Sequence, residues 1–298
     1  MRSYVQQLRG EELPKQYVNF VGRRSMLEHT FHRAEKLIPA NQILTVVSRQ
    51  HLAHAEVRRQ LAARPRETLI VQPANKETGP GILLPLMFIY KRCPEAIVAL
   101  FPSDHFILEE DRFINHVHLA AQAVNYEPTR IVLLAIEPHE PETDYGYVVP
   151  HKDVGRPCRF GTRPVSAFIE KPGADTAFEL MMGGGLWNTM TMVFKLDTLL
   201  ELVRRVHPAL HLNFCRILEA IGTVEEQRTV EDVYEVLEPV NFSKEIMMRI
   251  ANRHPRSLSV LPVRKVFWSD WGSRERVLQV FGRLDQGNSE RLKQSPAL

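Results

Sequence analysis

Short apolar runs alternate with amphipathic stretches along the first half of the chain. The runs have the length and the nearly uncharged centres of buried strands, at 43–47, 67–73, 96–104 and 130–136. The stretches between them carry apolar residues at helical spacing, at 51–64, 81–93 and 111–126. This order predicts βαβ units in an α/β fold: a Rossmann-like mixed, mostly parallel sheet with helices on both faces.

The hydrophobic pattern changes after about residue 138. A loop there precedes a short strand, and the next strand stops at a proline. Strands are expected at 145–150, 163–172, 189–195 and 257–263. Helices are expected at 173–182, in several pieces over 196–252, and at 273–285. Because no Gly- or Ser-rich linker interrupts the chain, we expect one domain over 1–285 and a frayed C-terminal tail over 286–298.

Composition and charge narrow the class of protein. Of the 298 residues, 44% are hydrophobic and 24% charged, which suits a chain with a real core. The net charge of +3, spread over 38 basic and 35 acidic residues, is too weak to predict a nucleic-acid partner. No apolar run approaches the roughly 20 residues that a membrane span needs. The well-separated Cys93, Cys158 and Cys215 predict neither disulfides nor a zinc site, so a cytoplasmic location is expected.

One of the apolar runs ends in an unexpected way. The stretch "AIVALFPSDH" begins with five apolar residues and ends in Asp104 and His105. In open parallel sheets, ligands bind outside the carboxyl ends of the strands, where a carboxylate needs a cationic partner or a metal. The alternative is that Asp104 caps the following helix or makes an Asx turn, and this motif alone leaves both interpretations open.

Further motifs follow in a fixed order along the chain. They are "LPKQYVNFVGRRSMLEHTFHRA" near the N-terminus, then "FPSDH", "YGYV", "FIEKP", "LWN" and "WSDWGS". Together, over about residues 10–280, this set resembles the sugar-phosphate nucleotidylyltransferases, the pyrophosphorylase family that includes mannose-1-phosphate guanylyltransferases. The resemblance implies a nucleotide-diphospho-sugar transferase fold. It also implies the reaction of mannose-1-phosphate with GTP to give GDP-mannose and pyrophosphate.

That reaction needs two polyanions to be aligned and their charge neutralised. The resemblance implies that Asp104 and Asp270 are catalytic and bind Mg²⁺, which prefers carboxylates plus substrate phosphates. It places Lys15 at the triphosphate and Lys171 at the sugar phosphate. The expected partners are therefore a nucleoside triphosphate, GTP in the first instance, and a sugar-1-phosphate, and a homodimer is left open.

Other motif positions correspond to substrate contacts. Glu170 and Asn188 would hydrogen-bond sugar hydroxyls, and Gly146 would offer its backbone at close range. Gln72 would read the base, with Gly79 and Gly81 letting the base lie near the backbone. Each position also has an ordinary structural interpretation as a surface lysine, a helix cap, a strand-end carboxylate or a turn glycine.

Departures from the family pattern keep a second hypothesis in view. A first strand with a loop like "LAGGxGTRLxPL" is not found, and we expect its loss to expose strand edges and to make this chain a weak catalyst. The upstream DNA would show whether the start codon was placed too late. Leu13, Glu77, Asp144 and Met190 also differ from the usual residues. The alternative is a non-catalytic paralogue that binds a sugar nucleotide and regulates a partner; a glycosyltransferase lacks support because no DxD pair is present.

Overall fold

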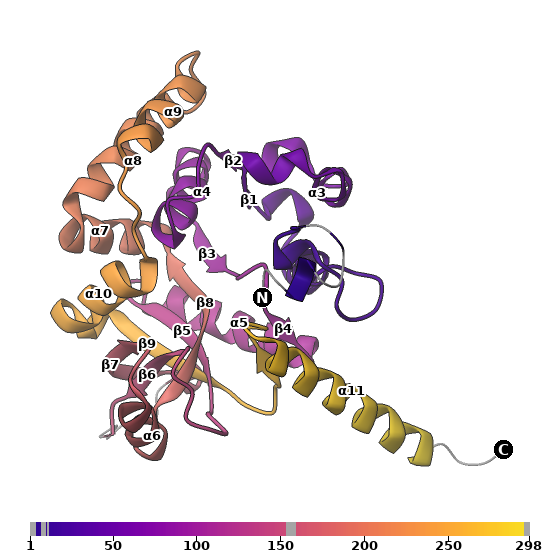
Figure 1. The fold of residues 1–298 in the computed structure, drawn as a ribbon. Helices are drawn as coiled ribbons and strands as arrows, with labels where there is room; N and C mark the ends of the chain where they lie inside the picture. Colours follow the sequence, from indigo (N-terminus) through magenta and orange to yellow (C-terminus); the bar gives the residue numbers. More distant parts are fainter. Residues whose placement is uncertain (1–3, 7–9, 11, 153–158, 295–298) are drawn as a thin grey trace.

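The computed structural model describes residues 4–6, 10, 12–152 and 159–294. In this part of the chain a mixed six-stranded sheet lies at the centre, in the order β3-β8-β5-β9-β7-β6, with β6 also pairing with β8 (Figure 1). The strands are β3 (Ile97–Leu100), β5 (Ile131–Ile136), β6 (Gly146–Pro150), β7 (Arg163–Glu170), β8 (Leu186–Lys195) and β9 (Leu258–Val263).

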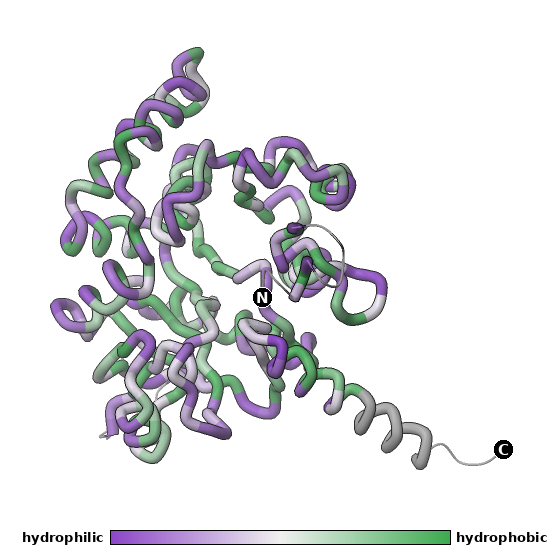
Figure 2. Tube along the Cα trace, in the orientation of Figure 1, coloured by the Kyte–Doolittle hydropathy of each residue, from purple (hydrophilic) through white to green (hydrophobic). Residues whose placement is uncertain are grey.

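Helices cover both faces of this sheet, as the sequence predicts. All residues of β5 are buried, and they alternate between two apolar clusters. Leu133 packs on one side with residues of α7 (Leu196–Val206) and α10 (Met248–Arg253), whereas Leu134 packs on the other with α5 (Glu110–Tyr126). This period of two is what a strand buried on both faces requires, and Figure 2 shows hydrophobic residues concentrated along the central strands.

The direction of β8 makes the pairing more antiparallel than the sequence predicts. The strands β3 and β5 run the same way, but β8 lies between them and runs antiparallel to both. Only β5 and β9 pair in parallel within the described part of this sheet. A mixed α/β fold is thus confirmed, and the difference arises because apolar runs indicate burial without indicating strand direction.

The strands β1 (Thr45–Ser48) and β2 (Leu69–Gln72) form a separate parallel pair. In the described residues β1 pairs only with β2, and β3 pairs only with β8, so each of β1 and β3 presents one unpaired edge. A small apolar cluster supports β1 through α2 (Met26–Glu35) and α3 (Ala55–Leu61). Figure 1 shows this N-terminal unit beside β3.

A two-residue pair joins the middle of the chain to its C-terminal part. The strand β4 (Phe106–Ile107) pairs antiparallel with β10 (Trp268–Ser269). The pair is too short to stand out in a hydrophobic pattern, and the sequence analysis did not predict it. It sets the position of the two aspartates described below.

The remaining helices agree with the predicted regions, apart from the tail. They are α4 (Thr78–Arg92), which continues through Pro85, α6 (Ala174–Met182), α8 (Pro208–Ala220), α9 (Glu226–Val236) and α11 (Arg274–Gln294). Short helical turns are η1 (Lys15–Tyr17), η2 (Ala40–Gln42), η3 (Arg49–Ala53), η4 (Arg66–Thr68), η5 (Arg159–Gly161), η6 (Phe242–Met247) and η7 (Pro255–Ser257). Helix α11 extends as far as Gln294, past residue 286, where the predicted tail begins. Residues 295–298 and Cys158 lie outside the described residues.

Candidate active site

The two aspartates predicted as metal ligands lie at the ends of paired strands. Asp104 lies two positions before β4, and Asp270 directly follows β10. Because Ser269 pairs with Phe106, the register of β4 and β10 brings the two carboxylates to the same edge. Two segments that are far apart in the sequence thus form one site, as the motif order predicts.

Lys15 connects these segments. Its Nζ atom lies 2.9 Å from Asp104 Oδ2 and donates a hydrogen bond of 2.7 Å to the backbone oxygen of Asp270. The side chain is about one-fifth exposed, so it is held in place and still reaches solvent. These two contacts place the Lys15 ammonium group between the two strand ends that carry Asp104 and Asp270.

Asp270 is fixed mainly through one of its carboxylate oxygens. Oδ1 accepts hydrogen bonds from the Tyr145 hydroxyl (2.9 Å), the Gly272 N–H (2.9 Å) and Arg276 Nη1 (3.0 Å). Oδ2 has a single longer bond of 3.2 Å from the same Nη1. Burial would raise the pKa of Asp270, but Arg276, the Gly272 N–H and Lys15 outweigh it and lower that pKa, so the carboxylate is charged.

His105 orients the neighbouring loop as a neutral ring. Its Nδ1 accepts a hydrogen bond of 3.2 Å from Trp268 Nε1, so the neutral tautomer carries its proton on Nε2. Nε2 lies 3.7 Å from Asp104 Oδ1. Burial lowers the pKa of His105 despite the nearby Asp104, which keeps the ring neutral near pH 7.

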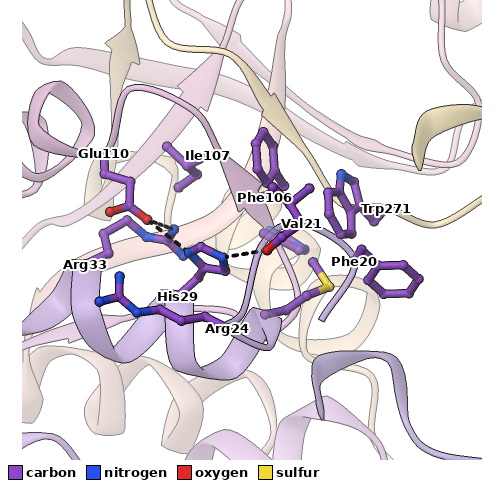
Figure 3. A pocket seen from close by; sticks show the side chains of 11 residues that line it. Phe20, Val21, Arg24, His29, Arg33, Phe106, Ile107, Glu110 and Trp271 are labelled. Carbon is purple, nitrogen blue, oxygen red and sulfur yellow. Dashed lines mark hydrogen bonds and ion pairs between the residues drawn. The ribbon is translucent and has the colours of Figure 1, made fainter. Parts of the chain in front are cut away.

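A buried ion pair lies beside this loop. The sequence analysis did not predict it. Arg33 on α2 is 1% exposed, and its Nη1 lies 3.3 Å from Glu110 Oε1 on α5. Figure 3 shows this pair beside His29, around a hollow that is also lined by Phe106 and Trp271. Burial lowers the pKa of Arg33 to about 10. The hollow has a volume of about 10 Å³, roughly the space of one water molecule, so it is a packing feature without room for a substrate.

Three of the predicted sugar contacts meet on adjacent strands. Gly146 on β6 pairs with Glu170 on β7, and a Cβ at Gly146 would lie 2.5 Å from Glu170 Oε2 and 3.6 Å from Asn188 Cβ. Asn188 lies on β8, which pairs with β6. The strand register therefore brings the three residues together, and Gly146 leaves the space into which the Glu170 carboxylate points.

Lys171 follows Glu170 and is linked through Tyr145 to Asp270. Its N–H donates to the backbone oxygen of Tyr145 (3.2 Å), the residue whose hydroxyl contacts Asp270. Burial raises the pKa of Glu170, while Lys171, Lys244 and a hydrogen bond with Ser243 act in the opposite direction. Ser243 and Lys244 belong to the π-helical turn η6, and the sequence analysis did not predict that this turn lies beside Glu170.

Met190 occupies a position where the family pattern has glycine. Its φ of 57° lies in the left-handed region that favours glycine. The Asn188 side chain folds around it: Oδ1 accepts from the Met190 N–H (3.1 Å), and Nδ2 donates to the sulfur (3.3 Å). Ser243 also donates to this sulfur (3.1 Å). The amide of Asn188 is thus pre-oriented, although part of its hydrogen-bonding capacity is used.

The predicted base contacts divide into two kinds. Gln72 ends β2, and its Oε1 is buried without a hydrogen-bond partner in the described residues; it lies 3.6 Å from where a Cβ of Gly81 would be. This acceptor is therefore free to receive a hydrogen bond from water or from a ligand. The N–H of Gly79, in contrast, donates to Val240 O (2.8 Å), and an added Cβ would lie 2.7 Å from that oxygen. Gly79 thus has a packing reason to be glycine.

Strained backbone gathers around these residues. Four non-glycine residues with positive φ adjoin or belong to the predicted set: Glu77, Lys171, Met190 and Trp271. Such conformations persist only where surrounding contacts hold them, and they concentrate at functional sites.

The aspartates fit the expected Mg²⁺ in donor chemistry. Both offer hard carboxylate oxygens, and two of these, Asp104 Oδ1 and Asp270 Oδ2, lack a short hydrogen bond. A Cβ at Gly272 would lie 2.6 Å from both Asp270 Oδ2 and Arg276 Nη1, so glycine lets the guanidinium reach this carboxylate. No group of three or more His, Cys, Asp or Glu residues suited to a metal occurs among the described residues.

The fold is a mixed α/β sheet that carries a cluster of carboxylates and a lysine at its strand ends. The chain belongs to the nucleotidyl transferase family, whose family model matches residues 10–286.

Relatives and solved structures agree with this placement. The xanthan biosynthesis protein XanB of Xanthomonas campestris is 28% identical over 94% of this chain and 57% of its own length. The mannose-1-phosphate guanylyltransferase of Escherichia coli K12 is 26% identical over 92% of this chain and 56% of its own length. A Thermus thermophilus structure described as mannose-1-phosphate geranyltransferase has a TM-score of 0.72 at 26% identity, covering 86% of this chain and 69% of that one. The chain spans about half the length of the curated relatives it matches.

Within the ranges that the structure describes, none of the helices combines the length and the apolarity needed to cross a bilayer.

Proposed function

We propose that this protein transfers a nucleotidyl group from a nucleoside triphosphate to a sugar-1-phosphate, with GTP and mannose-1-phosphate as the preferred pair. The observation that carries the proposal is the bridge of Lys15 to both Asp104 and Asp270 at one edge of the fold. The names of the guanylyltransferase relatives support the choice of substrates. The alternative, a non-catalytic regulator, is not favoured by these findings.

In the proposed reaction a phosphate oxygen of the sugar-1-phosphate attacks the α-phosphorus of the triphosphate. A new oxygen–phosphorus bond forms, the bond from the α-phosphorus to the bridging oxygen breaks, and pyrophosphate leaves with that electron pair. No covalent intermediate with the protein is needed, so alignment and charge neutralisation provide the catalysis.

The residues divide this work between two groups. Lys15 would contact the triphosphate, and Lys171 would contact the sugar phosphate. Glu170 and Asn188 would form hydrogen bonds with the sugar hydroxyls. Asp104 and Asp270 would hold Mg²⁺, which neutralises phosphate charge and polarises the α-phosphoryl group when bound. Gln72 would pair with the base through its unpartnered Oε1.

The test is release of pyrophosphate by the purified protein with Mg²⁺ and a panel of triphosphates and sugar-1-phosphates. We expect the highest kcat/KM with GTP plus mannose-1-phosphate. Asp104→Asn should abolish most of the signal, whereas Asp175→Asn, an exposed aspartate in the first turn of α6, should not. Release that is independent of the sugar-1-phosphate, or unaffected by Asp104→Asn, would contradict the proposal.

A further inference from the structure

Arg276 contacts several groups at the candidate metal site, although no motif includes it. It lies in the first turn of α11, and its side chain is 11% exposed. Nη1 donates to both carboxylate oxygens of Asp270, at 3.0 and 3.2 Å. The guanidinium also stacks over the Tyr145 ring, 4.4 Å from its centroid. A cation thus already occupies the carboxylate that a metal would use.

The other end of the same guanidinium has a second set of partners. Nη2 lies 2.8 Å from Glu142 Oε2 and 3.1 Å from Asp144 Oδ2. Asp144 is one of the departures from the family pattern, and its side chain is 66% exposed. These two carboxylates lie in the loop before β6, so Arg276 joins that loop to the residue following β10. The unusual Asp144 thereby acquires a physical role as a partner of Arg276.

The carboxylates at this site outnumber the cationic side chains that contact them. Four carboxylates, from Asp104, Glu142, Asp144 and Asp270, contact only two cationic side chains, Lys15 and Arg276, among the ion pairs of the described residues. The excess negative charge suits a divalent cation. A cation on Asp270 Oδ2 would repel the guanidinium beside it, and Glu142 and Asp144 offer a place where Arg276 keeps its ion pairs after leaving Asp270.

We propose that Arg276 competes with the metal for Asp270 and that Glu142 and Asp144 hold Arg276 when the metal binds. Arg276 is then a positioning residue: it keeps Asp270 ordered and charge-balanced until a divalent cation arrives. This inference rests on the proposed function, because it assumes that Asp270 is a metal ligand.

The competition predicts opposite effects for two substitutions. Arg276→Met removes the competing charge and should tighten binding of Mn²⁺ alone by at least about fivefold. Asp144→Asn keeps Arg276 but removes a carboxylate that holds the guanidinium away from Asp270. Mn²⁺ binding should therefore weaken. In the double variant the effect of Asp144→Asn should disappear, because Asp144 acts through Arg276. The loss of the free Mn²⁺ signal in electron paramagnetic resonance measures each affinity without any turnover.

Controls separate this effect from a general change of charge or stability. Arg283→Met removes an arginine from the same helix, one that stacks on Phe267 instead of pairing with Asp270, and should leave Mn²⁺ affinity unchanged. Thermal unfolding of each variant without metal shows whether it is folded. Should Arg276→Met fail to fold, the exposed Asp144→Asn variant still tests the predicted weakening.

The outcomes are distinct from those of the proposed function. Unchanged or weaker Mn²⁺ binding in folded Arg276→Met, tighter binding in Asp144→Asn, or no binding in any variant overturns the competition. In each of these cases pyrophosphate release that depends on Asp104 would still support the transferase. The opposite pattern, opposed Mn²⁺ effects without pyrophosphate release from any substrate pair, retains the competition and removes the transferase proposal.

Discussion

The sugar side and the nucleotide side of the candidate site are built in different ways. On the sugar side, Gly146, Glu170 and Asn188 lie on the neighbouring strands β6, β7 and β8, so backbone register sets their spacing. On the nucleotide side, Gln72 lies on the separate β1–β2 pair, and Lys15 is placed by its own side-chain contacts. We therefore expect substitutions on the sugar side to change affinity with little loss of stability, and those on the nucleotide side to change both.

The largest effect is expected where the two sides meet. Asp104→Asn or Asp270→Asn should each lower turnover by at least about 100-fold, the scale of losing one preorganised electrostatic contact. Asp104→Asn should change folding little, because asparagine fills the same space. Asp270→Asn should also lose some stability, because the charged carboxylate accepts hydrogen bonds from Arg276 and Gly272. Pyrophosphate release and thermal unfolding measure the two quantities. Turnover close to wild type in both variants would remove the metal-ligand assignment.

A pair of glycine substitutions compares the two sides directly. In Gly79→Ala the new Cβ would lie 2.7 Å from a backbone oxygen of Val240, and we expect a loss of about 1–3 kcal/mol in the free energy of unfolding. In Gly146→Ala the Cβ meets the Glu170 carboxylate, which can rotate, so sugar-1-phosphate affinity should fall with a smaller loss of stability.

The control for this pair is Gly173→Ala, where nothing lies within 4 Å of the added Cβ. Urea unfolding measures stability, and calorimetric titration of a sugar-1-phosphate measures affinity. Equal stability losses for Gly79→Ala and Gly146→Ala would contradict the difference between the two sides.

The nucleotide side also depends on a helix cap. Ser25 caps α2 in a capping box with Glu28, and its hydroxyl donates to Gln60 Oε1 on α3 (2.7 Å). Ser25→Ala should lower the free energy of unfolding by about 1 kcal/mol, because the cap is lost. Ser25→Thr, which retains a hydroxyl, should lose less. The prediction is wrong if the two variants unfold at the same urea concentration.

The smallest effect concerns pH. Because burial raises the pKa of Glu170 above its ordinary 4.5, ionising this carboxyl destabilises the folded state. The folded state binds the proton more tightly than the unfolded chain, so the contribution of Glu170 to stability is highest below pH 4.5 and falls as pH rises through the raised pKa. Glu170→Gln should abolish this fall in stability. A wild-type and a variant stability profile that remain parallel through this pH range would contradict it.

Some features of this protein could be predicted from its sequence, and others could not. Strand and helix positions followed from hydrophobic spacing, and a shared site for Asp104 and Asp270 was implied by the resemblance to the family. The antiparallel direction of β8 was not predictable, because apolar spacing is the same in either direction. Arg276 was missed because it is one of several charged residues in "SRERV". Its partner Asp144 stood out only as a departure, since a pairing across 132 positions leaves no local pattern.

The division into two sides is tested most directly by titrating two ligands into two variants. Lys171→Ala should weaken mannose-1-phosphate by on the order of 1.5–3 kcal/mol, the value of a charge-assisted contact, and leave GTP nearly unchanged. Lys91→Ala, an exposed lysine at the end of α4, should affect neither ligand. Equal losses for both ligands in Lys171→Ala, or no loss for either, would contradict the assignment of Lys171 and of the sugar side.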